Sequence, residues 1–67
     1  MKPWTFADAD RAARARGWRC SHAKGSHYVY VKAGESRNLV IPYHGGNLSR
    51  IVQRTLMHQL RISPRDL

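Results

Sequence analysis

Cysteine, acidic residues and long apolar runs are all scarce in this 67-residue sequence. The single cysteine, Cys20, excludes an intramolecular disulfide framework and zinc sites built on cysteine pairs. No apolar run approaches the roughly 20 residues that span a bilayer, and the first residues lack the hydrophobic stretch of a signal peptide. We therefore expect one cytoplasmic domain over residues 1–67, without membrane association.

The sequence has four acidic residues and twelve Lys and Arg residues, which gives a formal net charge of +8. Nine of the twelve are Arg, whose guanidinium groups bind phosphate bidentately and stack on bases. This excess favours nucleic acid as the partner, because a basic surface attracts phosphate backbones of any sequence. Charge alone leaves open the alternative that the basic surface binds an acidic protein.

The hydrophobic pattern predicts a helix, three strands and a second helix. The first helix should span about Phe6 to Arg16, with Thr5 and Asp8 as a capping box and Gly17 as its stop. The strands are expected at three short runs separated by turns: Trp18–Ala23, Ser26–Lys32 and Asn38–Tyr43. Short connections imply an antiparallel meander, so the expected fold is α+β, with two helices on one face of a three-stranded sheet.

The second helix, capped by Asn47 or Ser49, should extend to about Arg61 and end before Pro64. Its predicted apolar stripe consists of Leu48, Ile51, Val52, Thr55, Leu56 and Leu60. In the middle strand, alternation places His27, Val29 and Val31 on one face and Ser26, Tyr28 and Tyr30 on the other. Both sets contain apolar bulk, so the pattern leaves open which set faces the helices.

One histidine stands at the start of that strand, directly after a glycine turn, in the run Lys24-Gly25-Ser26-His27. Imidazole is the side chain whose charge changes nearest neutral pH, so it suits proton transfer. The residues alone also allow a purely structural histidine, hydrogen-bonded within the turn. No histidine pair at helical spacing with a third ligand is present, so we expect no metal site.

Four short motifs together resemble the HicA family of toxin–antitoxin mRNA interferases. They are Gly17-Trp18 after the first helix, Gly25-Ser26-His27, Pro42-Tyr43-His44, and Ile62-Ser63 before an acidic residue, Asp66. The resemblance covers nearly the whole chain. It departs from the family pattern at Ile51-Val52, where Gly-Thr is usual, and at Arg61, where the family tends to have Gly.

The resemblance implies a fold like that of double-stranded-RNA-binding domains and ribosome-independent cleavage of mRNA. It also implies a single catalytic histidine, which maps to His27, and neutralisation by a HicB-type antitoxin. Cleavage by one histidine requires no metal and no cofactor, because the 2′-OH of RNA attacks the adjacent phosphorus itself. The expected function is therefore a metal-independent endoribonuclease toxin that inhibits translation and growth.

Several neighbours are candidates to support His27. Lys24, Arg19 and the Gly25 amide could stabilise the developing phosphorane charge, and Ser26 belongs to the same turn. Tyr28 could stack on a base or pack in the sheet, and His44 could be a second acid/base group, although a loop histidine is the simpler interpretation. Two rivals to the enzyme remain, namely a non-catalytic RNA-binding module and a domain that binds an acidic protein.

Overall fold

The computed structural model describes residues 2–63, and its first element is the helix α1, Phe6–Ala15. Thr5 caps this helix as predicted, because its side chain accepts the Asp8 amide and the Asp8 carboxylate accepts the Thr5 amide at 2.9 Å. Gly17 follows the helix with a φ of +89°, a backbone conformation that glycine adopts at little cost. The predicted capping box and helix stop are therefore confirmed.

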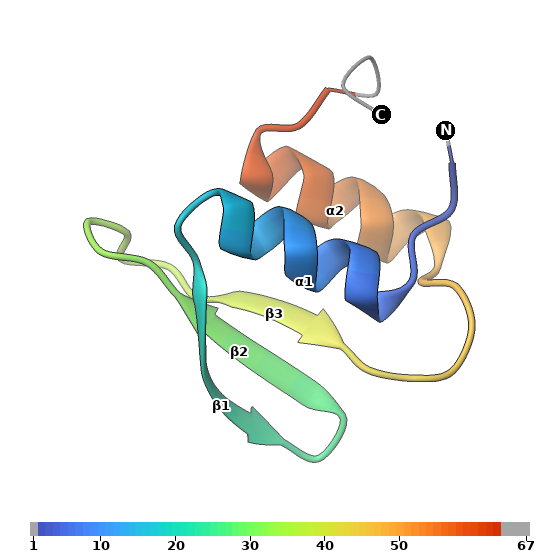
Figure 1. The fold of residues 1–67 in the computed structure, drawn as a ribbon, viewed down its shortest axis with the longest axis horizontal. Helices are drawn as coiled ribbons and strands as arrows, with labels where there is room; N and C mark the ends of the chain where they lie inside the picture. The colour runs from blue at the N-terminus through green and yellow to red at the C-terminus, as the bar shows by residue number, and fades with distance from the viewer. Residues whose placement is uncertain (1, 64–67) are drawn as a thin grey trace.

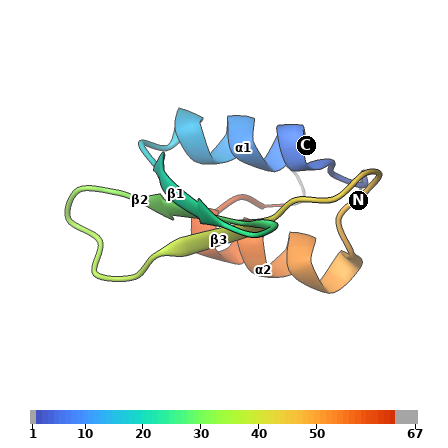
Figure 2. The same ribbon diagram turned by 90° about the horizontal axis from the view of Figure 1, so that it is seen from below.

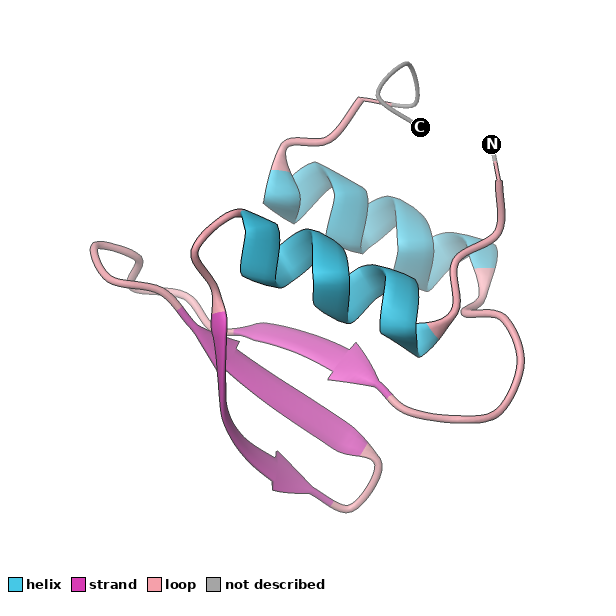
Figure 3. Cartoon of the chain, in the orientation of Figure 1, coloured by secondary structure: helices cyan, strands magenta, loops and turns pink. Residues whose placement is uncertain are grey.

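Three strands follow as an antiparallel sheet in the order β1-β2-β3: β1 is Arg19–Lys24, β2 is His27–Val31 and β3 is Leu39–Pro42 (Figures 1 and 3). Pro42 ends the edge strand β3, where its missing N–H disturbs no ladder. The α+β class and the predicted order of elements are confirmed. β1 has the expected length but begins and ends one residue later than predicted, whereas β2 and β3 are each shorter than their sequence patterns suggested.

The two faces of the sheet are buried to different degrees. Tyr28 lies opposite Ile41 and Tyr30 lies opposite Leu39, so these four side chains share one face. Tyr30, Leu39 and Ile41 are at most 1% exposed. His27, which pairs with Pro42, belongs to the other face and is exposed, as is Val40 at 42%. The tyrosine set therefore faces the core, which the alternation left undecided.

Helix α1 lies over the tyrosine face. The Phe6 ring is 4.9 Å from that of Tyr28, and the Tyr30 hydroxyl donates a hydrogen bond to the Asp10 carboxylate. The second helix, α2 (Arg50–Leu60), contacts both α1 and β3. In Figure 2, α1 is drawn above the strands and α2 below them. The buried side chains of both helices join the tyrosine face in one core, as expected of two helices on one face of the sheet. Helix α2 lies along the β3 edge, where it also borders the opposite face.

Helix α2 presents a different stripe to the core from the predicted one. Ser49 caps it by accepting the Val52 amide, as one of the two expected caps. Ile51, however, is 79% exposed, while the polar Gln53 is only 2% exposed. The residues that α2 buries are Gln53, Leu56, Met57 and Leu60. The prediction that Ile51 and Thr55 belong to the buried stripe is therefore wrong.

The N-terminal segment explains why Gln53 is buried. Its side-chain oxygen accepts the Trp4 amide at 2.9 Å, and its nitrogen donates to the Lys2 carbonyl at 2.7 Å. Trp4 is itself 5% exposed, and its carbonyl accepts the Leu48 amide at 2.7 Å. A buried backbone needs such partners, so α2 is rotated to supply them. This rotation leaves Ile51 and Thr55 on the exposed side of the helix.

Candidate active site on the open face of the sheet

His27 lies on the face of the sheet that α1 does not cover. We call this face the open face; by strand register it carries Arg19, His22, Lys24, His27, Val29, Val31, Val40 and Pro42. His27 is the first residue of β2 and is exposed. Its ring forms no hydrogen bond and no ion pair among residues 2–63. The exposed imidazole is therefore available to a ligand.

The β1–β2 hairpin places a cation directly beside His27. Lys24 is its cross-strand partner, and such partners have Cβ atoms roughly 5 Å apart on the same face. The loop between them is Gly25-Ser26, and Gly25 has a φ of +59°. Two-residue hairpin loops require a positive φ, which explains a glycine here. This tight loop fixes the register that brings Lys24 and His27 together.

A groove of about 280 Å³ begins at His27. His27, Val40 and Pro42 form its sheet side, and α2 contributes Ile51, Val52, Thr55, Leu56 and Gln59. Its walls are mainly apolar, with the Thr55 hydroxyl and the Gln59 amide as polar groups. The apolar pattern of α2 did not predict this groove, because that pattern placed Ile51 and Thr55 in the core. Their rotation out of the core is what creates the helix side of the groove.

Two of the expected supporting residues do not lie near His27. Arg19 shares the open face but pairs with Val31, four residues further along β2, which corresponds to about 13 Å of strand. Tyr28 points to the opposite face, where its ring packs against Phe6 and lies 5.9 Å from that of Tyr43. Arg19 therefore belongs to the far end of the open face, and Tyr28 belongs to the core side.

Ser26 and His44 take local roles at the edge of the site. The Ser26 carbonyl accepts the Tyr43 amide at 2.6 Å, which extends the β2–β3 pairing by one residue. His44 follows Tyr43 in the connection to α2, is exposed, and has a ring nitrogen 3.1 Å from the Gly45 carbonyl oxygen. No hydrogen bond joins His44 to His27 within the described part of the chain. Asp66, the acidic residue of the fourth motif, and Pro64 lie outside the described residues.

Several titratable groups of α1 and of the sheet face beneath it form hydrogen bonds or ion pairs within the fold. Burial and the hydrogen bond to Asp10 raise the pKa of Tyr30, so its phenol stays protonated at neutral pH. The hydrogen bond from the Thr5 amide is the main cause that lowers the pKa of Asp8. Asp10 also accepts Arg14 Nε at 3.0 Å. On the open face, the side chains of His27 and Lys24 form no hydrogen bond or ion pair within residues 2–63, whereas the His22 ring lies 3.2 Å from the Ser21 hydroxyl.

Residues 2–63 bring no three His, Cys, Asp or Glu side chains together in the way that metal ligands cluster. Neither helix within that range has the length and apolar character needed to cross a membrane.

Neither a scan against models of protein families nor a search of curated proteins finds a match to this chain. Function is therefore inferred from the residues and the groove of the open face.

Proposed function

We propose that this protein is a cytoplasmic endoribonuclease toxin of the HicA type, which cleaves mRNA without the ribosome. The observation that carries the proposal is the pairing of an exposed imidazole, His27, with a cation, Lys24, beside a groove on the open face. The order helix, three antiparallel strands, helix supports a fold like that of double-stranded-RNA-binding domains. The net charge of +8 supports a polyanionic substrate.

In this proposal, His27 accepts the proton of the ribose 2′-OH as a general base. The freed electron pair forms the bond from the 2′-oxygen to phosphorus, and the bond from phosphorus to the 5′-oxygen breaks. The leaving 5′-oxygen takes up a proton from water, and protonated His27 returns its proton to water, so the products carry a 2′,3′-cyclic phosphate and a 5′-OH. Lys24 stabilises the negative charge that builds up on the phosphorane. A positioned base of this kind contributes about 10²–10⁴-fold to the rate.

The test uses two histidines of the same face. Purified wild-type, His27→Ala and His22→Ala proteins are incubated with a transcript in EDTA, and fragments and end groups are analysed. His22 is exposed and lies on the same face, opposite Val29. We expect wild type and His22→Ala to yield fragments with 2′,3′-cyclic phosphate ends. We expect His27→Ala to lose at least about 10²-fold in rate. Cleavage by His27→Ala at the wild-type rate would refute the assignment.

One observation favours the alternative of a non-catalytic RNA-binding module. His27 has no hydrogen-bonding partner in residues 2–63 that would fix its ring, whereas catalytic bases are usually oriented by a third group. The module would bind the transcript with a strong salt dependence and leave it intact. Binding without any cleavage, equal for wild type and His27→Ala, would establish this alternative.

A HicB-type antitoxin is the proposed partner, and we propose that it covers the groove at His27. The exposed apolar side chains of Val40 and Ile51 flank that groove, and an acidic partner would complement the charge around it. Hydrogen exchange of the complex should show protection from Lys24 to Tyr28. A bound complex that leaves this segment unprotected and still cleaves RNA would exclude inhibition by occlusion.

A further inference from the structure

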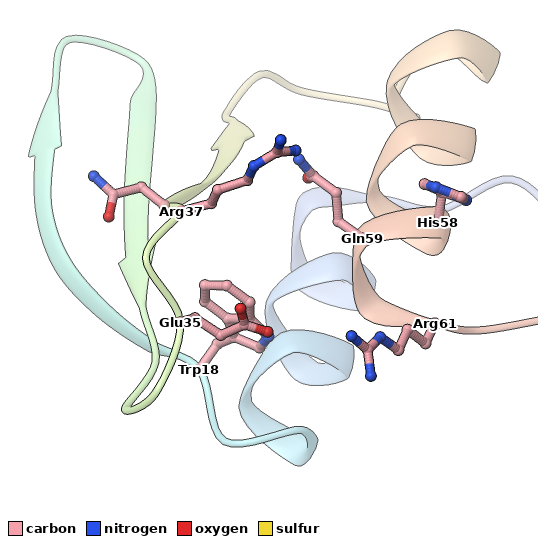
Figure 4. Close-up of a pocket in the computed structure, with 7 residues that line it drawn as sticks. Trp18, Glu35, Arg37, His58, Gln59 and Arg61 are labelled. Atoms are coloured by element: carbon pink, nitrogen blue, oxygen red, sulfur yellow. The ribbon is translucent and has the colours of Figure 1, made fainter.

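A second hollow lies at the opposite end of β3 from His27. It has a volume of about 240 Å³ between the β2–β3 loop and the end of α2. Its lining consists of Trp18, Glu35, Arg37, Asn38, His58, Gln59 and Arg61. Figure 4 shows Arg37 reaching toward Gln59 and Arg61 pointing back toward Trp18 and Glu35. An adjoining hollow of about 260 Å³ adds Arg16 and Lys32, so four cations surround one carboxylate.

Three of these cations, Lys32, Arg37 and Arg61, form no side-chain hydrogen bond or ion pair within residues 2–63. Arg16 Nε donates to the Leu60 carbonyl at 3.0 Å and so helps to end α2. Arg37 and Arg61 are exposed, and their side chains form no hydrogen bond or ion pair within residues 2–63. Glu35 contributes the single opposing charge and likewise has no ion pair in that range. The hollow therefore has unpaired positive charge available for an anion.

The backbone at Arg61 points to a role for its side chain. Arg61 caps α2 with φ +58° and ψ +42°, and among the described residues no other non-glycine has a positive φ. This left-handed conformation is disfavoured for arginine and is the usual place for glycine at a helix end. The capping hydrogen bonds come from the backbone N–H of Arg61, which donates to the His58 and Met57 carbonyls. Folding therefore does not require the guanidinium at this position.

The hollow adjoins the groove that begins at His27, because Gln59 lines both. Arg37 stands five positions before Pro42, the cross-strand neighbour of His27. A fully extended chain of that length spans about 17 Å, which is the upper limit of the separation along the backbone because β3 begins only at Leu39. A strand of RNA whose scissile phosphate lies at His27 can therefore follow the groove along β3 and α2. Its backbone would then pass Arg37 and Arg61.

We propose that Arg37 and Arg61 form a distal phosphate subsite, which anchors the RNA strand at the opposite end of β3 from the scissile bond. This inference rests on the proposed RNA substrate. Arginine suits the role because its guanidinium binds phosphate bidentately. Glu35 limits the strength of the subsite through its opposing charge.

The first experiment measures binding of a single-stranded oligoribonucleotide in the His27→Ala background, so that cleavage cannot interfere. The variants are Arg37→Gln with Arg61→Gly, Glu35→Gln, and the matched control Arg50→Gln with Arg54→Gln. The control removes the same charge from exposed positions on α2 that line neither hollow. Arg61→Gly also relieves the left-handed conformation, so its melting temperature should be equal to or above that of the parent. Weakened binding by this variant then cannot result from unfolding.

We expect the Arg37/Arg61 variant to bind about tenfold more weakly and to lower the salt slope by about 0.7 for each lost contact. Glu35→Gln should bind more tightly, and the control should change binding about twofold or less. If the Arg37/Arg61 variant and the Arg50/Arg54 control lose RNA affinity equally, binding depends only on the overall positive charge of the protein, and the subsite is overturned. An unchanged affinity of the Arg37/Arg61 variant, or absence of RNA binding by the parent, would overturn it as well.

A second experiment separates this inference from the proposed function. A dinucleoside monophosphate has only the scissile phosphate and cannot reach the distal hollow. With His27 intact, the Arg37/Arg61 variant should cleave it at the wild-type rate but should show a raised KM on long RNA. If no substrate is cleaved while the binding difference persists, the nuclease proposal fails and the subsite stands. If long RNA is cleaved with unchanged KM, the subsite fails and the nuclease stands.

Discussion

The face of the sheet under α1 and the open face differ in what their polar side chains do. Under α1, Tyr30, Asp10 and Arg14 are joined by hydrogen bonds and an ion pair. On the open face, His27 and Lys24 lie side by side without such partners in the described chain. Groups that stabilise a fold are satisfied within it, whereas groups that act on a ligand must remain accessible. One face therefore carries polar groups that stabilise the fold, and the other carries polar groups that remain accessible to a ligand.

The largest expected difference between the faces lies in two adjacent residues of β3. Ile41 is fully buried on the α1 side, and Val40 is 42% exposed on the open face. Ile41→Ala should lower the free energy of unfolding by about 2–5 kcal/mol, through lost burial and a cavity. Val40→Ala should change it by less than about 1 kcal/mol. Urea unfolding followed by circular dichroism measures both, and equal losses would remove the distinction between the faces.

Gln53 gives the next largest effect. Gln53→Ala leaves the Trp4 amide and the Lys2 carbonyl without their partner, and an unsatisfied buried backbone group costs about 1–3 kcal/mol. Gln59→Ala is the matched control, because Gln59 is an exposed glutamine of the same helix. Both are compared by thermal unfolding. A Gln53→Ala protein as stable as the control would show that the N-terminal segment is not anchored through this residue.

The Tyr30 hydroxyl should contribute less. Tyr30→Phe removes the hydrogen bond to Asp10 but keeps the buried ring, so we expect a loss of about 1 kcal/mol in unfolding free energy. Tyr43→Phe, at a position that is 53% exposed, should be neutral. Spectroscopic titration adds a second readout, because the raised pKa of Tyr30 should make its phenol ionise above the ordinary range of tyrosine. Loss of a high-pH phenol transition in Tyr30→Phe checks this, and a Tyr30 that ionises in the ordinary range would contradict its burial.

The smallest effect concerns the pH dependence of stability at the start of α1. The Thr5 amide lowers the pKa of Asp8 in the folded protein, so the folded state binds this proton less readily than the unfolded chain. The contribution of Asp8 is therefore present above its unfolded pKa, about 3.9, and is lost as the pH falls through the folded pKa. In Asp8→Asn, the free energy of unfolding should therefore fall less steeply than in the wild type as the pH is lowered into this range. The same fall in both proteins would mean that the capping box contributes nothing measurable.

The sequence predicted those parts of the fold that depend on local chemistry. Thr5 with Asp8 marked the start of α1, Ser49 was one of two expected caps of α2, and Gly25 marked the hairpin loop. The rotation of α2 could not be predicted, because it depends on hydrogen bonds between Gln53 and a segment about fifty residues away in the chain. Periodicity treats Gln53 as a surface residue and Ile51 as core, and the tertiary contact reverses both assignments.

The candidate site was also predictable only where it depends on local sequence. The Gly25-Ser26-His27 run identified the hairpin and the histidine at the start of β2 from local sequence, but left the exposure of the imidazole open. The groove beside His27 requires the rotated α2, so Ile51, Thr55 and Gln59 were missed. Arg19 and Tyr28 were grouped with His27 because they are close in sequence. Strand register instead places Arg19 about 13 Å along the sheet and turns Tyr28 to the other face.

Paired measurement of cleavage and stability for His27→Ala tests the central claim most directly. The claim is that the open face carries the chemistry without contributing to the fold. We predict that His27→Ala unfolds at the wild-type midpoint and binds RNA with wild-type affinity, yet loses cleavage by at least about 10²-fold in EDTA. Cleavage retained at the wild-type rate, or activity lost only because the variant unfolds, would contradict the account.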